Sequence, residues 1–230
     1  MTETKPTRSV RRILASTLGV VACLILVLLL VVATRPDTFS VSRSATIPAP
    51  AADVFPYIND LQKWRAWSPY EQLDSEMQRE YSASTAGAGA SYRWVGNSQA
   101  GVGRISVTES LPHEHVRLVL AMEKPFACSN DVEFVFEPGE QTGDTVVTWT
   151  MSGKLGFLPK LMHLVFDIDG MVGDQFEEGL TNLNAVVVEN QTESASDAAT
   201  DEQQSITGSG RSHDVDVVPS AGPGSDNRAS

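Results

Sequence analysis

The sequence predicts an α+β domain, in which an antiparallel sheet curves around a long C-terminal helix, with a single membrane-spanning helix before it. Three patterns predict this arrangement. Residues 13–33 form an uncharged apolar run, residues 78–152 repeat with a period of two, and residues 161–188 repeat with a helical period. Strands joined by short turns pair as antiparallel hairpins, and an amphipathic helix must bury its apolar side against another element.

The N-terminal apolar run, from Ile13 to Ala33, contains no charged residue. At 1.5 Å per residue, a helix over this run spans roughly 30 Å, which matches the hydrocarbon core of a bilayer. Only Arg35 follows the run closely, whereas four bases precede it: Lys5, Arg8, Arg11 and Arg12. The positive-inside rule therefore predicts a single-pass membrane protein, with residues 1–12 in the cytoplasm and the domain extracytoplasmic, either periplasmic or at the cell surface.

Two other targeting segments compete with a membrane anchor for this run. A cleaved secretory signal has an apolar core of about 7–15 residues and ends in small residues, whereas this run is longer and ends in Val31-Val32-Ala33-Thr34. A lipoprotein cleaved before Cys23 would continue with polar residues, whereas Leu24 to Val32 stay apolar. We therefore favour a retained transmembrane helix at residues 13–33.

Residues 37–188 are numerous enough to form one domain with a sizeable core. Its first strand covers Thr38 to Ile47, where apolar and hydroxyl side chains alternate, and a short helix is expected over Ala51 to Ile58. Glycine and proline turn signals separate six further strands. These are Gln78–Ser82, Gly89–Val95, Gly101–Glu109, His115–Glu123, Ser129–Glu137 and Thr145–Ser152.

A linking segment, Phe157-Leu158-Pro159, leads into the long helix, which is expected from about Leu161 to Val188. One side of this helix is apolar and the other carries acids and amides. The apolar stripe consists of Met171, Val172, Phe176, Leu180, Leu183 and Val187. Residues 190–230 contain no aromatic residue and are rich in Ser, Thr, Gly, Asp and Gln, so we expect a disordered acidic tail.

Charge and cysteine content exclude some classes of protein. The formal net charge is -12, and without residues 1–34 the chain keeps 28 acids and 13 bases. Such a domain is repelled by the phosphates of nucleic acids and by anionic lipid surfaces. The two cysteines, Cys23 and Cys128, lie in different predicted parts of the chain, so no disulfide is expected, and Cys128 is expected to be a small buried residue.

Three segments carry a resemblance to a known family. They are Ser44-Ala45-Thr46-Ile47-Pro48-Ala49-Pro50-Ala51-Ala52-Asp53-Val54-Phe55, then Ile58-Asn59-Asp60-Leu61 with Trp64-Arg65-Ala66-Trp67-Ser68-Pro69-Tyr70, and finally Phe176-Glu177-Glu178-Gly179-Leu180-Thr181-Asn182-Leu183. Residues 37–188 resemble the START/Bet v 1-like (SRPBCC) superfamily, and within it the polyketide cyclase/dehydrase-like branch. The resemblance implies a helix-grip fold, in which the sheet and the long helix enclose a cavity for a hydrophobic small molecule. The anchor and the tail are not part of the family pattern.

In such a cavity, large side chains can form an apolar wall with a few polar groups. We select eight candidate ligand-binding residues: Trp67, Tyr92, Trp94, Met122, Asn130, Phe134, Trp149 and Phe176. Asn130 shares the strand parity of Val132 and could orient a ligand carbonyl or hydroxyl group. Glu109 shares the parity of Val107, which makes it the best inward carboxylate and a weak candidate for catalysis. It also closes its strand, where a solvated position is the plainer interpretation.

No metal or cofactor is expected. The run His113-Glu114-His115 lacks a third ligand at a useful spacing, and no phosphate-binding or nucleophile motif occurs.

Together these patterns favour a membrane-anchored protein that binds a hydrophobic small molecule or lipid and does not bind nucleic acid. Two alternatives stay open. One is a cyclase or hydratase acting on a polyketide-like substrate, which needs a polar residue facing the cavity. The other is a non-binding envelope scaffold that recruits another protein through its tail or an exposed strand edge. The sequence does not specify the ligand, the protein partners or the oligomeric state.

Overall fold

The computed structural model describes residues 8–156, 160 and 167–208. The elements occur in the following order: α1 (Arg8–Ala33), β1 (Thr38–Ile47), α2 (Ala51–Asn59), the 3₁₀ turns η1 (Lys63–Ala66) and η2 (Pro69–Gln72), β2 (Gln78–Tyr81), β3 (Ser91–Val95), β4 (Val102–Leu111), β5 (His115–Lys124), β6 (Cys128–Pro138), β7 (Thr145–Lys154) and α4 (Ile168–Gly208).

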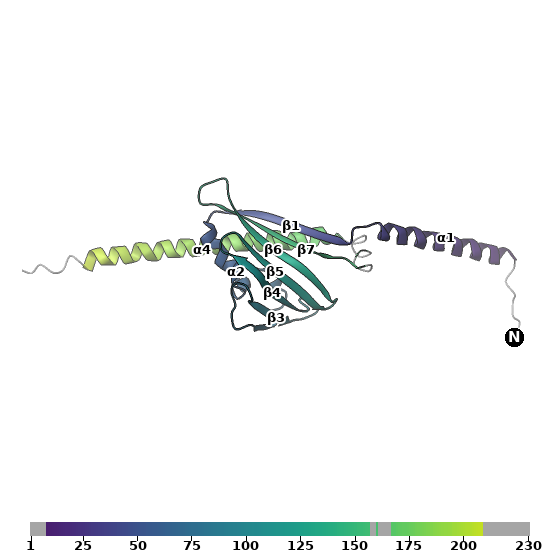
Figure 1. Ribbon diagram of the computed structural model, residues 1–230, viewed down its shortest axis with the longest axis horizontal. Helices are drawn as coiled ribbons and strands as arrows, with labels where there is room; N and C mark the ends of the chain where they lie inside the picture. Colours follow the sequence, from purple (N-terminus) through teal and green to yellow (C-terminus); the bar gives the residue numbers. More distant parts are fainter. Residues whose placement is uncertain (1–7, 157–159, 161–166, 209–230) are drawn as a thin grey trace, which may run out of the picture. The chain divides into compact units, whose positions relative to one another are not determined.

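Seven strands form one antiparallel sheet in the order β1-β7-β6-β5-β4-β3-β2 (Figure 1). The strands β2 to β7 follow one another as a meander, and β1 pairs with β7 from Thr38 opposite Lys154 to Ile47 opposite Thr145. Each strand expected from the alternating pattern is present, with ends that differ by one or two residues. The structure therefore confirms the predicted α+β class with its antiparallel sheet.

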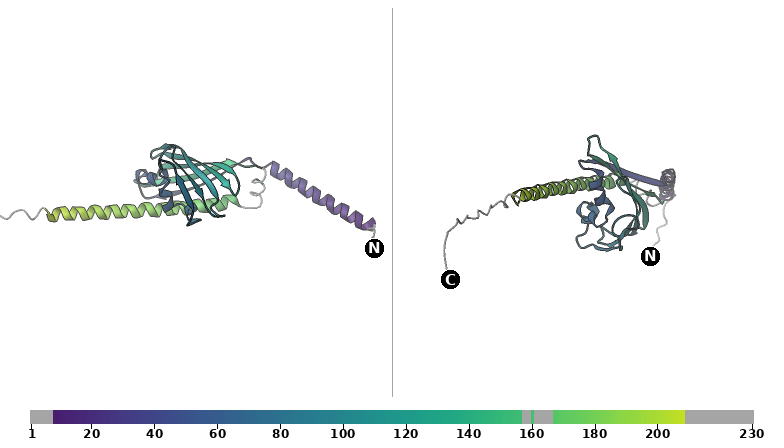
Figure 2. Two further views of the ribbon diagram at one scale, coloured as in Figure 1. Left: turned by 90° about the horizontal axis from the view of Figure 1, so that it is seen from below. Right: turned by 60° about the vertical axis from the view of Figure 1, so that its left-hand side comes forward.

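The sheet is curved (Figure 2). Its inward face carries the domain core. Alternate positions of β6 and β7, such as Phe134 and Trp149, are buried because the side-chain period of a strand is two. Burial of each large apolar side chain contributes roughly 1.5–3 kcal/mol relative to an exposed one. From β1, β5 and α2, further fully buried members of this core are Val41, Ile47, Val54, Ile58 and Leu118.

The short helix α2 and the turn η1 are joined by two tryptophans. The indole N–H of Trp64 donates to the carbonyl oxygen of Ile58 at 2.8 Å, and that of Trp67 donates to the carbonyl oxygen of Tyr57 at 2.9 Å. Both indoles are buried, so these hydrogen bonds satisfy donors that would otherwise be costly to bury. They fix the segment that follows, from Ser68 onward, which supplies one side of the candidate site.

The helix α4 contributes its apolar stripe to the same core up to Val187. Phe176, Leu180, Leu183 and Val187 are buried, as expected from their spacing. Met171 was predicted to belong to this stripe and is exposed instead. The correction follows from helix geometry, because Val172 lies four residues before Phe176 on the buried side and Met171 is rotated by about 100° from it.

The chain divides after Val188 into two compact units, and α4 passes through the division to Gly208. The sequence predicts a helix end near Val188 and a disordered tail, whereas the described helix is longer. Residues 189–208 contain no glycine before Gly208 and no proline, and Ala, Glu and Gln favour helix. Residues 209–230, and the expected link and helix start at 157–159 and 161–166, lie outside the described part of the chain.

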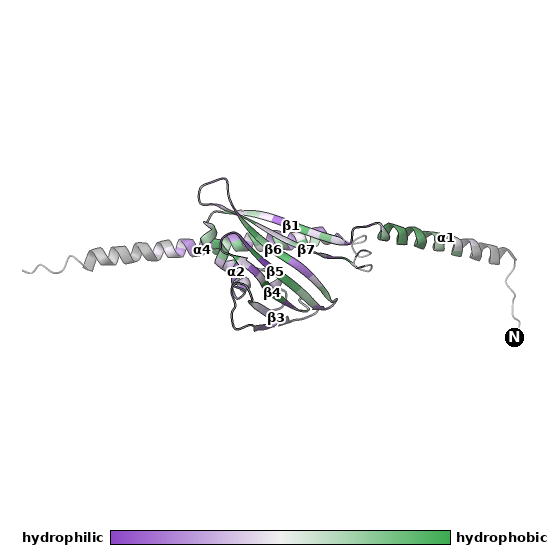
Figure 3. Ribbon diagram, in the orientation of Figure 1, coloured by the Kyte–Doolittle hydropathy of each residue, from purple (hydrophilic) through white to green (hydrophobic). Residues whose placement is uncertain are grey.

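The helix α1 contains a window, Ser16–Ala33, with a mean hydropathy of 2.9. Figure 3 shows that this window is hydrophobic along its length, in contrast to the mixed colours of the strands. By length and composition the helix is able to cross a membrane, and a signal sequence near the N-terminus has the same properties. Residues 1–7, which include the basic residue Lys5, lie outside the described part of the chain.

One residue at the start of β6 differs from its expected burial. Cys128 was predicted to be a small buried residue and is exposed, as is Phe126 two residues before it. Cys128 is the first residue of β6 and Phe126 lies in the turn before it, beyond the end of the sheet's inward face. Strand parity predicts burial only inside a paired strand, so it does not apply to this turn.

Candidate ligand-binding cavity

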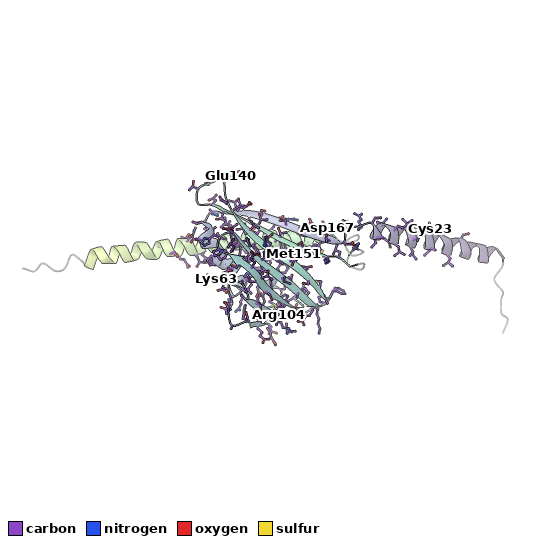
Figure 4. The ribbon with its side chains drawn as sticks, viewed as in Figure 1. Cys23, Lys63, Arg104, Glu140, Met151 and Asp167 are labelled. Carbon is purple, nitrogen blue, oxygen red and sulfur yellow. The ribbon has the colours of Figure 1, made fainter. Side chains whose placement is uncertain are left out.

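A cavity of about 290 Å³ lies between the inward face of the sheet and α4. Strands β3 to β7 supply most of its wall, α4 supplies Val172 and Phe176, and the segment around η1 and η2 closes one side. Met151, which Figure 4 labels on β7, is one of the wall residues from the sheet. The wall is mainly apolar and aromatic, which is the usual composition of a site for a small organic ligand.

Six of the eight predicted ligand-binding residues lie at the cavity wall: Tyr92, Trp94, Met122, Asn130, Trp149 and Phe176. Trp67 and Phe134 do not line the cavity. They pack behind it, where the ring centroids of Trp67 and Trp149 are 5.6 Å apart and those of Phe134 and Trp149 are 4.9 Å apart. Both residues therefore support the wall without forming it. Sequence parity gave the correct face for Phe134 but could not distinguish the wall from the layer behind it.

The indole of Trp149 is the centre of the aromatic wall. It stacks on the ring of Phe176, with centroids 4.0 Å apart and an interplanar angle of 9°. Its N–H is buried and has no hydrogen-bond partner among the described residues, and the same holds for the hydroxyl of Ser68. Both residues line the cavity, so the wall contains polar atoms whose hydrogen-bonding capacity is unused within the described chain.

A buried polar cluster of Glu71, Arg79 and Tyr92 forms another part of the site. The carboxylate of Glu71 accepts a hydrogen bond from Nε of Arg79 at 2.5 Å and one from the hydroxyl of Tyr92 at 2.6 Å. The side chains of Glu71 and Arg79 are 3% and 12% exposed. Burial, reinforced by the negative charge of Glu71, raises the pKa of Tyr92 well above its usual value, so this phenol keeps its proton and acts as a donor.

Glu71 lines the cavity together with Tyr92, and sequence reasoning missed it. It lies in η2, a single 3₁₀ turn that begins at Pro69, and such a turn has no periodic pattern from which an inward position can be read. Its partner Arg79 is in β2, at the opposite edge of the sheet from β1. Only the folded chain brings these two residues together.

Asn130 lies at the wall near the start of β6, as its parity predicts. Its amide nitrogen is 3.9 Å from Sγ of Cys128 and 3.9 Å from Sδ of Met151. Sulfur is a weak hydrogen-bond acceptor, so these contacts hold the amide only weakly. Asn130 is thus a polar group at the wall that can still bind a ligand carbonyl or hydroxyl.

Glu109, the candidate catalytic carboxylate, is not at the cavity. The register between β4 and β5 shifts between Val107 and Glu109, and this irregularity breaks the parity on which its inward position was based. Its carboxylate is exposed and accepts a hydrogen bond from Arg117 at 2.6 Å. The hydrogen bond from Arg117 holds the pKa of Glu109 below its usual value, the opposite of what a buried general base shows.

One protein family and several solved structures are similar to this chain. A family model described as polyketide cyclase / dehydrase and lipid transport matches residues 38–188. Similar solved structures include a Thermobifida fusca protein with 22% identity, covering 64% of this chain and 92% of that chain with a TM-score of 0.48. A protein from Thermus thermophilus also has 22% identity, covering 66% of this chain and 99% of that chain with a TM-score of 0.47. None of the curated proteins matches this sequence.

Proposed function

Because the chain belongs to the polyketide cyclase/dehydrase and lipid transport family, we propose that it binds a hydrophobic small molecule between the sheet and α4 while α1 anchors it in a membrane. The observation that carries this proposal is the cavity itself. Its volume of about 290 Å³ is enclosed by aromatic and aliphatic side chains from five strands and one helix. A domain that only served as a scaffold would gain stability by closing this space, because unfilled apolar volume is destabilising.

The wall also indicates the kind of ligand. Ligand pockets usually measure about 300–1,000 Å³, so this cavity suits a compact molecule or one part of a larger lipid. Its few polar wall residues are Ser68, Glu71, Gln99 and Asn130, in addition to the phenols and indoles. The ligand is therefore an apolar body with one neutral polar group, such as a hydroxyl or carbonyl. A carboxylate on the ligand would be repelled by the carboxylate of Glu71.

The proposed topology follows from α1. Its apolar window and the bases before it favour a cytoplasmic N-terminus and an extracytoplasmic domain. Protease added outside intact cells is expected to remove the domain and leave α1 in the membrane. A domain that is protected from external protease in intact cells, and cleaved after lysis, would contradict this orientation.

Two neighbouring residues of β5 provide a test of ligand binding. Leu120 lines the cavity, whereas Val119 is on the opposite face of the same strand. In the full-length chain, Leu120→Trp should fill part of the cavity and reduce the ligand recovered by mass spectrometry at least tenfold, whereas Val119→Trp should leave recovery unchanged. If neither the unaltered chain nor the Val119→Trp variant retains a small molecule, and no added apolar ligand binds, the scaffold alternative is favoured.

The enzyme alternative rests on a different observation, the buried carboxylate of Glu71 beside the hydroxyl of Tyr92 at the cavity wall. In such a reaction the hydroxyl of Tyr92 would turn its one O–H from Glu71 to a substrate carbonyl as a hydrogen-bond donor, while Arg79 keeps its contact with Glu71. The Tyr92→Phe variant separates the two functions. If Tyr92→Phe still binds the ligand but loses the turnover of the unaltered chain, the protein is an enzyme. If both chains release the bound ligand unchanged and neither shows turnover, the protein is a binding protein.

A further inference from the structure

The connection from α1 to the sheet is short and determines which end of the sheet lies near the end of α1. Only residues 34–37 separate Ala33 from Thr38, and four residues span at most about 14 Å. The connection is also tied to the sheet, because the backbone N–H of Leu155, just after β7, donates to the carbonyl oxygen of Asp37 at 2.7 Å. We call the end of the sheet that contains Thr38 and Lys154 the anchor-side end.

Strand register places the β5–β6 turn at this same end. Gly153 of β7 is opposite Asn130 of β6, and Cys128 of β6 is opposite Met122 of β5. The turn between β5 and β6 therefore lies at the same end of the sheet as Lys154. Figure 4 shows the two ends, with Asp167 near the anchor-side end and Glu140, in the β6–β7 turn, at the other.

The anchor-side end carries exposed apolar side chains. Phe126, in the β5–β6 turn, is 71% exposed, and Val95, at the end of β3, is 40% exposed. Two exposed lysines, Lys124 and Lys154, lie beside them. An exposed aromatic residue among lysines is typical of a segment at a membrane interface, where the ring enters the acyl boundary and the ammonium groups reach the headgroups. Residues 124–128 contain one base and no acid, and the adjacent Glu123 is paired with Arg93.

The mouth of the cavity is at the same end. The wall residues from the sheet and α4 that remain partly exposed are Leu120, Met122, Asn130, Met151 and Val172. Each lies within four residues of the anchor-side end of its strand or of the start of α4. Phe176 and Trp149, which lie farther along their elements, are buried. The cavity thus opens beside the β5–β6 turn and becomes enclosed with distance from it.

We propose that the β5–β6 turn, residues 125–127, docks on the bilayer by inserting Phe126 into its interface, and thereby places the cavity mouth against the membrane. An apolar ligand then passes between the bilayer and the cavity without crossing bulk water. The docking partner is a lipid bilayer, because the chain length between α1 and Thr38 keeps this turn near one. This inference rests on the proposed function in that α1 is the anchor, and it adds the site and the source of the ligand.

The experiment uses Cys128, which is exposed and two residues from Phe126. The full-length chain with Cys23→Ala is labelled at Cys128 with a polarity-sensitive fluorophore and reconstituted in phosphatidylcholine vesicles. Lipids that carry a spin label are expected to quench this fluorophore by at least half. Such quenching reports contact of the label with acyl chains. A label that folded into the cavity would show a blue shift of its emission without this quenching.

A matched control lies at the opposite end of the sheet. Leu111, the last residue of β4, is 42% exposed, so a chain with Cys23→Ala, Cys128→Ser and Leu111→Cys carries the same fluorophore there. That label should not be quenched. Adding Phe126→Ser to the first chain should remove most of the quenching at Cys128. Equal quenching at both positions, or quenching that Phe126→Ser does not change, would overturn the proposal.

The two proposals fail in different ways. Membrane retention of α1 is measured by alkaline extraction of the same vesicles, and ligand binding by mass spectrometry of the purified chain. A retained ligand with an unquenched label would refute docking and leave the proposed function intact. A quenched label with no ligand bound would support docking and refute the binding function.

Discussion

Trp149 on β7 and Phe176 on α4 stack face to face, with ring centroids 4.0 Å apart and an interplanar angle of 9°. This contact joins β7 to the helix, and both residues also form part of the cavity wall. Gly179 lies about one turn further along α4. A Cβ atom there would be 2.8 Å from the indole of Trp149 and 3.0 Å from Cδ of Pro69. The glycine thus permits the close approach of helix and sheet that the stack requires.

The first prediction concerns this close approach. Gly179→Ala should lower the free energy of unfolding by about 1–3 kcal/mol, because the added methyl group pushes α4 from the sheet. Intrinsic helix propensity alone would predict a gain of about 1 kcal/mol, so the two effects differ in sign. Urea unfolding followed by tryptophan fluorescence measures the change, with Glu178→Ala at an exposed neighbouring position as the control. A more stable Gly179→Ala variant would contradict the structure.

The second prediction concerns the buried cluster. Glu71→Gln leaves the guanidinium of Arg79 buried without its carboxylate and should destabilise the fold by roughly 3 kcal/mol. Tyr92→Phe removes one hydrogen bond to Glu71 and keeps the ion pair, so it should cost about 2 kcal/mol. The exposed pair of Arg93 and Glu123 is the control, and Glu123→Gln should leave the unfolding midpoint unchanged. An equal effect of Glu71→Gln and Glu123→Gln would show that burial does not strengthen the cluster.

The strands of the fold were predictable to within two residues, whereas the site was predictable only in part. Alternation identifies strands because one face of each is buried, and the helical stripe of α4 identifies its buried side. These patterns gave the face of Trp149, Phe176 and Asn130 correctly. They do not reveal where packed side chains leave space, because that depends on the shapes of residues from several elements. Trp67 and Phe134 fill the layer behind the wall for this reason.

Glu109 is exposed, in line with the plainer interpretation of its position, and Glu71 was not predicted; the two outcomes have separate physical causes. A register irregularity in β4 turns Glu109 outward, and no residue type in the sequence marks its position. Glu71 lies in a single 3₁₀ turn, and its burial depends on Arg79 and Tyr92, which are distant in the sequence. Local patterns determine local structure, so a carboxylate whose partners come from two strands is found only in the folded chain.

The third prediction concerns alkaline pH. Burial raises the pKa of Tyr70 to about 12 and that of Tyr92 well above its usual value. In the unfolded chain both tyrosines titrate near pH 10. Their contribution to stability is therefore complete below about pH 10 and is lost as the pH rises toward 12, because the unfolded chain releases these protons first. Urea midpoints across this range should fall, and more steeply for the unaltered protein than for Tyr92→Phe.

Tyrosinate absorbance provides the control for this prediction. In the folded protein, Tyr70→Phe should remove a component that titrates near pH 12 and leave the components at lower pH unchanged. A folded protein in which all tyrosines ionise together near pH 10 would show that burial does not raise the pKa of Tyr70 or of Tyr92.

The last prediction concerns the polar group of the ligand. The amide nitrogen of Asn130 lies within hydrogen-bonding range of the sulfurs of Cys128 and Met151, and both contacts are weak. Asn130→Leu should therefore change the free energy of unfolding by less than about 1 kcal/mol, while ligands with a hydroxyl or carbonyl group should bind at least tenfold more weakly.

Ser129→Leu, at the adjacent exposed position, is the matched control. Mass spectrometry of the ligands bound to each variant measures the effect. An unchanged set of ligands in Asn130→Leu would show that this amide does not contact the polar group, and would leave Tyr92 and Ser68 as the groups that do.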